Sequence, residues 1–217
     1  PFNGTFDGAG HSVNGLLIDR SGVSHQGLFG VTDSNSAVKN VAVTGFEIRG
    51  GDYCGGMIGR AYGEVWNCRA SGDVAATNMV GGVVGCAEAI LAGCSNAAVV
   101  AGANGVGGVV GQVRGSVEDC SNSGPVTGAN DLGGVVGYAL GDLHRCSNSG
   151  TVAAIDGERA GGVAGSCSGA SIVECANSGD VSGPVDAGGI VGYAYDGSMV
   201  DRCMNSGRVS GVWVGGI

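Results

Sequence analysis

A short glycine motif recurs along the chain at a nearly constant distance. It reads Gly-Gly, two apolar residues and Gly, and it begins at Gly55, Gly81, Gly107, Gly133, Gly161 and Gly188, with a partial copy at Gly215. Successive copies are 26, 26, 26, 28, 27 and 27 residues apart. Such a period is typical of repeat architectures, in which each unit packs against its neighbours. The glycine content, 47 of 217 residues, excludes an ordinary helical or α/β domain.

A second motif follows the first within each unit. Its clearest copies read Cys-x-Asn-Ser-Gly-x-Val and begin at Cys120, Cys146, Cys175 and Cys203. Valine outnumbers leucine 31 to 7, and β-branched side chains favour strands over helices. A unit of this size cannot bury its own apolar face, whereas a stack of such units can. We therefore expect an all-β fold, a parallel β-solenoid of about eight rungs stacked about 4.8 Å apart, with glycine at its corners.

The two motifs together resemble the GLUG repeats of bacterial cell-surface and secreted proteins, and residues 2–16 resemble the segment that often precedes them. The resemblance implies a right-handed parallel β-helix with rungs of 26 to 28 residues. On this basis residues 1–54 form diverged rungs and residues 215–217 start a further repeat. Between them lie six GLUG-like repeats, at 55–80, 81–106, 107–132, 133–160, 161–187 and 188–214.

Residues at equivalent places in successive repeats should stack as columns along the solenoid. One such column is a cysteine ladder of Cys68, Cys94, Cys120, Cys146, Cys175 and Cys203. Two residues later stands an asparagine ladder of Asn96, Asn122, Asn148, Asn177 and Asn205, whose amides should hydrogen-bond along the axis. We expect both ladders to lie inside. Because Ala70 takes the asparagine place in the first repeat, the amide ladder should begin one rung later.

The place just before each ladder cysteine reads Asn67, Gly93, Asp119, Arg145, Glu174 and Arg202. If this column faces solvent, opposite charges alternate over four rungs at a separation of about 5 Å, which helps to hold register. The inward-facing Val117 and Cys120 have opposite parity along the strand. A bend is therefore expected near residues 118–119.

Nine cysteines leave at least one thiol unpaired. Stacked cysteines have nearly parallel Cβ directions about 4.8 Å apart, which is wider than a disulfide prefers, so buried free thiols are favoured over strained disulfides. No Cys-x-x-Cys pair or nearby histidine completes a zinc site, so we expect no metal and no cofactor. Cys86 stands in a variable, mostly polar column and is the candidate exposed thiol.

The formal charge of −9 and the single lysine, Lys39, argue against nucleic acid as a partner. The sequence also contains no apolar stretch long enough for membrane insertion. Asp156 and Glu158 lie in the one enlarged loop between repeats, and this loop is the best local candidate for contact with a cation or another ligand.

Two further features could be read as ligand sites. Cys167 stands at the centre of a Gly-x-Cys-x-Gly sequence, yet it falls in an alanine column, which explains it as a repeat corner. Tyr62 and Tyr195 share one column, and Tyr138 and Tyr193 share another, so these rings could stack on sugars. Neither pair occupies adjacent rungs, which argues against an aromatic platform.

These observations favour a non-catalytic β-solenoid segment of a bacterial extracellular or cell-surface protein, acting as a stalk or an adhesin-like binding surface. Its partner would be a host protein or a glycan, and flanking domains of the same chain are expected. Two alternatives remain open. The segment could be an accessory region of a secreted peptidase, since GLUG-type repeats also occur in non-catalytic parts of IgA-cleaving metallopeptidases, or it could be a carbohydrate-active β-helix enzyme.

Overall fold

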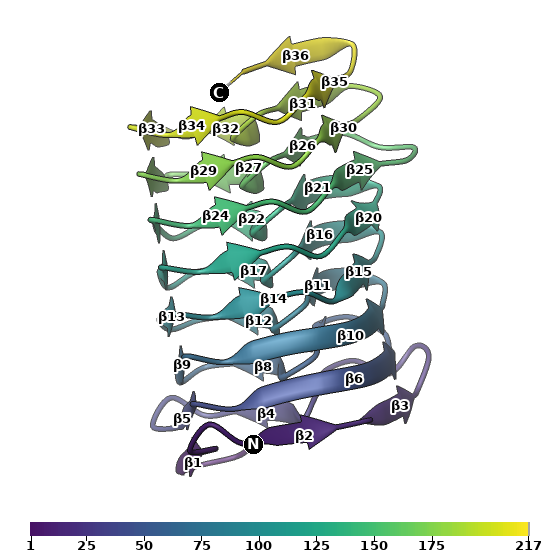
Figure 1. Cartoon of the computed structure of the whole chain (residues 1–217), viewed down its shortest axis with the longest axis vertical. Coiled ribbons are helices and arrows are strands. Elements are labelled where there is room, and N and C mark those ends of the chain that lie inside the picture. The colour runs from purple at the N-terminus through teal and green to yellow at the C-terminus, as the bar shows by residue number, and fades with distance from the viewer. Residues whose placement is uncertain (217) are drawn as a thin grey trace.

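Short parallel strands stack rung upon rung along one axis, from the N-terminal rung at the bottom of Figure 1 to the C-terminal rung at its top. The computed structural model describes residues 1–216, which form strands, turns and bends and contain no helix. No described segment is therefore a helix able to cross a bilayer. Each strand pairs with its counterpart one repeat away, as Asn96 does with Asn122, and the expected parallel β-solenoid is confirmed.

Four sheets run along the solenoid, and each coil of the chain visits them in order. Sheet I has eight strands, which shows about eight rungs. Its strands are β1 (Thr5–Asp7), β5 (Ala37–Lys39), β9 (Glu64–Trp66), β13 (Leu91–Ala92), β18 (Val117–Glu118), β23 (Leu143–His144), β28 (Ser171–Val173) and β33 (Met199–Asp201).

Sheet II has 14 strands, because the chain forms one long strand here in the second and third rungs and two short strands in each of the others. The unsplit strands are β6 (Ala42–Arg49) and β10 (Arg69–Ala75). Its short strands are β2 (Ser12–Asn14), β3 (Leu17–Asp19), β14 (Ser95–Asn96), β15 (Val99–Ala101), β19 (Ser121–Asn122), β20 (Val126–Gly128), β24 (Ser147–Asn148), β25 (Val152–Ala154), β29 (Ala176–Asn177), β30 (Val181–Ser182), β34 (Met204–Asn205) and β35 (Val209–Ser210).

Sheets III and IV have seven strands each and flank the Gly-Gly motif. Sheet III contains β7 (Cys54–Gly55), β11 (Asn78–Gly81), β16 (Asn104–Gly107), β21 (Asn130–Gly133), β26 (Ala160–Gly161), β31 (Asp186–Gly188) and β36 (Trp213–Gly215). Sheet IV contains β4 (Phe29–Thr32), β8 (Ile58–Ala61), β12 (Val84–Ala87), β17 (Val110–Val113), β22 (Val136–Ala139), β27 (Ala164–Ser168) and β32 (Val191–Tyr195).

The coil is right-handed. In Figure 1 the front strands β6 and β10 run from left to right while the chain climbs from its N-terminus to its C-terminus. This is the hand that connections between parallel strands of one sheet adopt almost without exception. The expected right-handed parallel β-helix is confirmed.

One continuous apolar core fills the inside of the coil. Its columns are the small and β-branched side chains of the repeats, for example Val65, Leu91 and Val117, each at most 1% exposed. Because equivalent side chains lie one rung apart, each packs on its own copy in the neighbouring repeat. The repeated sequence thus produces one apolar core that continues from rung to rung.

Candidate binding surfaces and ladders

Each coil turns from sheet I into sheet II at a single residue with left-handed backbone. This residue is the one before each ladder cysteine, with φ of 53° at Asn67, 64° at Gly93, 51° at Asp119, 52° at Arg145, 56° at Glu174 and 49° at Arg202. Such φ values are uncommon for residues with a side chain. The bend that sequence parity required near residues 118–119 is therefore a one-residue corner at Asp119.

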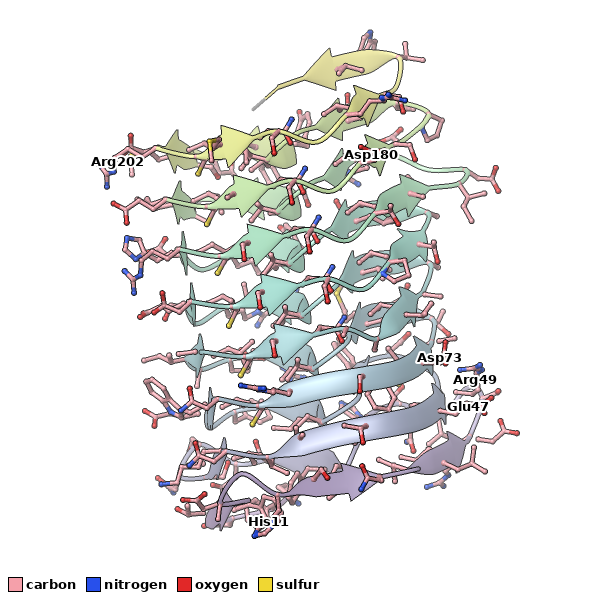
Figure 2. The ribbon with its side chains drawn as sticks, in the orientation of Figure 1. His11, Glu47, Arg49, Asp73, Asp180 and Arg202 are labelled. Carbon is pink, nitrogen blue, oxygen red and sulfur yellow. The ribbon has the colours of Figure 1, made fainter. Side chains whose placement is uncertain are left out.

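The corner side chains point outward and form ion pairs between rungs. Arg145 donates two hydrogen bonds to the Asp119 carboxylate, at 2.7 and 2.8 Å, and its guanidinium lowers the pKa of Asp119. One pair further along, Arg202 Nε lies 3.2 Å from Glu174 Oε1. Figure 2 shows Arg202 at the outer edge of the solenoid. The expected alternation of exposed charges is confirmed at these two pairs.

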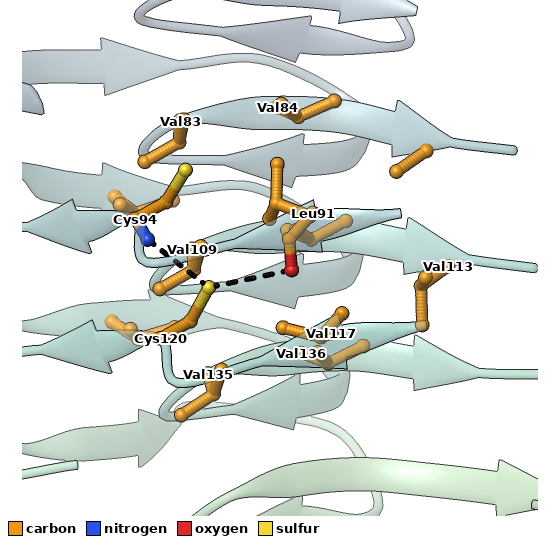
Figure 3. Close-up of a cluster of buried hydrophobic side chains, with 14 of the residues drawn as sticks. Val83, Val84, Leu91, Cys94, Val109, Val113, Val117, Cys120, Val135 and Val136 are labelled. Atoms are coloured by element: carbon orange, nitrogen blue, oxygen red, sulfur yellow. Dashed lines mark hydrogen bonds between the residues drawn. The ribbon is translucent and has the colours of Figure 1, made fainter. Parts of the chain in front are cut away.

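The ladder cysteines are buried free thiols, except that Cys203 in the last rung is half-buried. Each ladder thiol has a backbone carbonyl within donating distance, and four of the sulfurs also accept from the backbone N–H of the preceding ladder cysteine, those of Cys94, Cys120, Cys175 and Cys203. The Cys120 sulfur accepts from the backbone N–H of Cys94 at 3.3 Å and lies 3.7 Å from Leu91 O (Figure 3). Its thiol also lies within donating distance, 3.2 Å, of Glu118 O. These thiols act as small apolar side chains that also satisfy the backbone beside the corner.

The asparagine ladder is confirmed as a buried chain of amides. Asn96 Nδ2 donates to Asn122 Oδ1 at 2.9 Å, and the same bond, at 2.8 Å, joins Asn122 to Asn148, Asn148 to Asn177 and Asn177 to Asn205. Within its own rung Asn122 also donates to Gly124 O at 2.8 Å and accepts from Gly124 N at 3.2 Å. Each buried amide is therefore satisfied both along the axis and across its own turn.

The ladder depends on the second glycine of each Gly-Gly pair. A Cβ at Gly134 would lie 2.2 Å from Asn148 Cγ, and one at Gly162 would lie 2.4 Å from Asn177 Cγ. At the first repeat Ala70 replaces the asparagine, and a Cβ at Gly56 would instead meet the buried ring of Phe46, at 2.6 Å. The ladder begins at Asn96, one rung later than the cysteine ladder, as the sequence predicted.

Sequence reasoning missed a second, half-buried amide ladder at the start of sheet III. Asn78 donates to Asp52 Oδ1 at 2.7 Å, Asn104 to Asn78 Oδ1 at 2.7 Å, and Asn130 to Asn104 Oδ1 at 2.9 Å. The backbone N–H of Glu158 then donates to Asn130 Oδ1 at 2.9 Å. The signal was present, because asparagine recurs at 78, 104 and 130 with the spacing of the repeat.

The prediction that Cys86 is an exposed thiol is wrong, since this residue is 1% exposed. It lies between two long neighbours of its column, Arg60 and Gln112, and its sulfur is 3.7 Å from Gln112 Oε1 and 3.8 Å from Glu88 Oε1. Arg60 also forms an ion pair with Glu88, in which Arg60 Nη2 lies 2.5 Å from Glu88 Oε1. Burial, assisted by the Glu88 charge, raises the pKa of Cys86 to about 11.

Asp156 and Glu158 are exposed on the enlarged loop between β25 and β26, as their place in the sequence indicates. The backbone of Glu158 joins this loop to the preceding rung, since its N–H donates to Asn130 Oδ1 and its carbonyl accepts from the N–H of Asp131. Among residues 1–216 no group of three or more potential metal-ligating side chains comes together. A role for this loop in ligand contact stays a prediction.

A shallow groove follows the outer face of sheet II along the axis. Three adjoining hollows of about 310, 400 and 410 Å³ share lining residues, the first two sharing Ser121 and Ser123, and the last two Ala42 and Arg69. Its serines bond to the preceding rung, as Ser149 Oγ donates to Asn122 O at 3.3 Å. The groove is open because its side chains are small, and their hydroxyls hold register.

The lining of these hollows includes no carboxylate, so they offer no pair of acids for glycoside hydrolysis. Asp73 and Asp180, which share a column, lie along the same edge of sheet II with several rungs between them (Figure 2). Asp73 and Asp180 are therefore too far apart to act on one bond. Glu47 is the register partner of Asp73 on the neighbouring strand, and it forms an ion pair with Arg49 at 3.3 Å.

Comparison with known proteins agrees with the repeat structure. The family described as "The GLUG motif" matches residues 102–127, 128–153 and 183–210, each copy beginning five residues before a Gly-Gly pair (102 against 107, 128 against 133, 183 against 188). A segment of 79 residues is 34% identical to halomucin of Haloquadratum walsbyi, covering 36% of this chain and 1% of halomucin. No solved structure matches the chain.

The family unit and the repeats seen in the structure differ in starting point and agree in period. Two of the three matched copies are contiguous. Each of the three contains one Gly-Gly pair and one Asn-Ser-Gly sequence. The chain thus carries GLUG motif repeats, and these repeats form its right-handed β-solenoid.

Proposed function

We propose that this chain is a non-catalytic segment of an extracellular or cell-surface protein, where it serves as a rigid stalk and an adhesin-like binding surface. The observation that carries the proposal is the unbroken axial ladder from Asn96 to Asn205, which ties successive rungs into one stiff body. Regular outer columns on that body present the same kinds of side chain at fixed intervals.

The comparisons support the location. Halomucin is a mucin by its name, and this chain is similar to a small part of it, which favours a surface setting here as well. The acidic balance, 19 Asp and Glu against 10 Lys and Arg, suits a soluble surface and disfavours nucleic acid. The partner would be a host protein or a glycan.

The proposal can be tested with the chain fused to a fluorescent protein. We expect the fusion to be retained on at least one member of a panel of immobilised extracellular-matrix proteins and polysaccharides. We also expect it to release no fragments from casein or xylan, because its grooves lack paired acids. Small-angle scattering should show a rod about 38 Å long for eight rungs. Turnover of either substrate, or no retention on any surface, would contradict the proposal.

A further inference from the structure

All five tyrosines of the chain lie on or against sheet IV, although they are far apart in sequence. Tyr138 is on β22, Tyr193 and Tyr195 are on β32, and Tyr62 directly follows β8. Tyr53 reaches the same sheet, because its ring packs against the Arg60 guanidinium of β8 at 5.5 Å. Tyrosine combines an apolar ring with a polar end and loses little entropy on binding, which makes it a frequent contact residue.

Three of these tyrosines form one cluster across three rungs. The hydroxyls of Tyr138 and Tyr195 are 2.5 Å apart, and the rings of Tyr193 and Tyr195 are 5.8 Å apart between centroids, with planes at 46°. Their backbones are separated by the rung of β27, so the side chains must extend along the axis to meet. The repeat columns give backbone positions and not the reach of side chains, so the contact between Tyr138 and Tyr195 could not be predicted from them.

The intervening rung makes the contact possible because its outward residues are small. Ser166 pairs with both Tyr138 and Tyr193, and Ser168 pairs with Tyr195. Two serines leave space above the sheet, and the tyrosine side chains reach into it from both sides. The hydrogen bond between Tyr138 and Tyr195 then fixes their orientation before any ligand arrives.

Polar groups surround the cluster. Asp131 accepts a hydrogen bond from Ser166 Oγ at 2.6 Å and lies 3.1 Å from Arg159 Nε. The exposed Asp196 accepts from Ser168 Oγ at 2.8 Å. Tyr195 contacts both other tyrosines, and Tyr193, at 48% exposure, is the exposed member of the three. The site is therefore an open aromatic platform with carboxylate and guanidinium groups at its edge.

We propose that the platform of Tyr138, Tyr193 and Tyr195 binds a neutral polysaccharide chain. This proposal rests on the binding role proposed above. A pyranose ring has an apolar C–H face that fits an aromatic ring, and its peripheral hydroxyls match planar acceptors and donors such as Asp196 and Arg159. A flat site aligned with the solenoid axis suits an extended polymer, since small ligands are bound in concave pockets.

Other partners fit this surface less well. Nucleic acid and anionic lipid are disfavoured by the charge of −9. The outer columns of sheet IV hold mostly aromatic and polar side chains, with Val31 and Leu140 as aliphatic members, whereas the centre of a protein interface is apolar and loses its water. A protein partner is therefore the competing outcome of the test.

The tyrosines at the other end of the same face provide a matched control. Arg60 lies over the ring of Tyr62 at 4.9 Å and over that of Tyr53 at 5.5 Å, and His25 stacks on Tyr53 at 5.2 Å. The Arg60 guanidinium therefore occupies one face of the Tyr62 ring, which is otherwise 40% exposed. Tyr62 shares its column with Tyr195, so Tyr62→Ala removes the same side chain from an equivalent place without touching the platform.

The test is affinity electrophoresis of the whole chain in gels containing hydroxyethylcellulose, xylan or mannan, with polygalacturonate as the charged comparison. We expect at least one neutral polymer to retard the chain, and Tyr193→Ala to weaken that binding roughly tenfold or more, as truncation of a central aromatic contact does. Tyr193→Phe and Tyr62→Ala should bind like the parent.

Two results would overturn the proposal. One is an absence of retardation by all three neutral polymers, and the other is equal binding by Tyr193→Ala. If the chain is retained on immobilised protein through Tyr193 and on no polysaccharide, the platform binds protein, and the surface role proposed above still stands. If it is retained on neither, that surface role fails as well. Circular dichroism of each variant separates lost binding from lost folding.

Discussion

The side chain of Asn122 lies directly against Gly108, so closely that a Cβ at residue 108 would be 2.3 Å from Asn122 Cγ and 2.1 Å from the backbone oxygen of Gly134. Because one obstacle is backbone, the clash cannot be relieved by a rotamer change. Gly108→Ala should destabilise the chain by at least about 3 kcal/mol. Thermal unfolding should show a midpoint lowered by about 6 °C or more.

The control for this substitution is Gly216→Ala, because a Cβ at Gly216 meets no atom within 4 Å. Its unfolding midpoint should match that of the parent. If Gly108→Ala were as stable as Gly216→Ala, the two sequence motifs would not be locked together in the way described.

The buried amide ladder should be more costly to break in its middle than at its last rung. Asn122→Ala breaks the ladder bonds to Asn96 and Asn148 and removes the partner of both backbone groups of Gly124. Each unsatisfied buried group costs about 1–3 kcal/mol, so we expect a total loss of about 3–5 kcal/mol. Asn205 is only half-buried, and Asn205→Ala should cost much less. Urea denaturation of both variants checks this, and equal losses would refute it.

Thiol labelling should find no rapidly reacting cysteine in the native chain at pH 8, although all nine are free. Cys203, the half-buried one, should react first, and Cys203→Ser should remove that first phase. Cys86→Ser should leave the rates unchanged, because burial and the Glu88 charge raise the pKa of Cys86 to about 11. A fast phase that disappears in Cys86→Ser would contradict the buried site.

The corner ion pairs should make stability depend on salt. Arg145→Glu places acidic side chains in three successive corners, those of Asp119, residue 145 and Glu174, and repulsion between them should lower the unfolding midpoint at low ionic strength. In 1 M salt most of the loss should be recovered. Arg20→Glu makes the same charge change at an exposed residue away from this column, and its midpoint should move little.

Acid should act on the same corner. The hydrogen bonds from Arg145 lower the pKa of Asp119 below its usual 3.8, so this carboxylate stabilises the fold above pH 3.8. Its contribution is lost as the pH falls through the lowered native value. The stability difference between the parent and Asp119→Asn should therefore shrink below pH 3.8, as measured by urea denaturation at a series of pH values. A difference that grows in acid would contradict the pairing.

The parts of this structure that repeat were predictable from sequence. The period located the ladders at Cys120 and Asn122, and the parity change between Val117 and Cys120 demanded the corner that φ of 51° at Asp119 provides. In a solenoid the neighbours of such a residue are the equivalent residues of the adjacent repeats. Its surroundings can therefore be found by aligning the repeats of a single sequence. Ala70 likewise predicted where the amide ladder begins.

The parts that depend on unlike neighbours were not predictable in this way. The variable column of Cys86 suggested exposure, yet Arg60 and Gln112 are long enough to close over a small thiol. Tyr138 and Tyr195 stand in different columns two rungs apart, and they meet only because Ser166 and Ser168 leave room between them. Side-chain length and direction decide such contacts, and the spacing of the repeats does not report either of them.

The stacking of rungs also determines what extra repeats contribute. Each coil consumes 26 to 28 residues and advances the molecule by about 4.8 Å, whereas a single α-helix of 26 residues would extend about 39 Å. The solenoid therefore gains little length along its axis per residue, and it presents a large side surface per residue. Each added repeat places another set of side chains in register with those before it, so the number of repeats sets valency toward a long ligand more than it sets distance from an anchor.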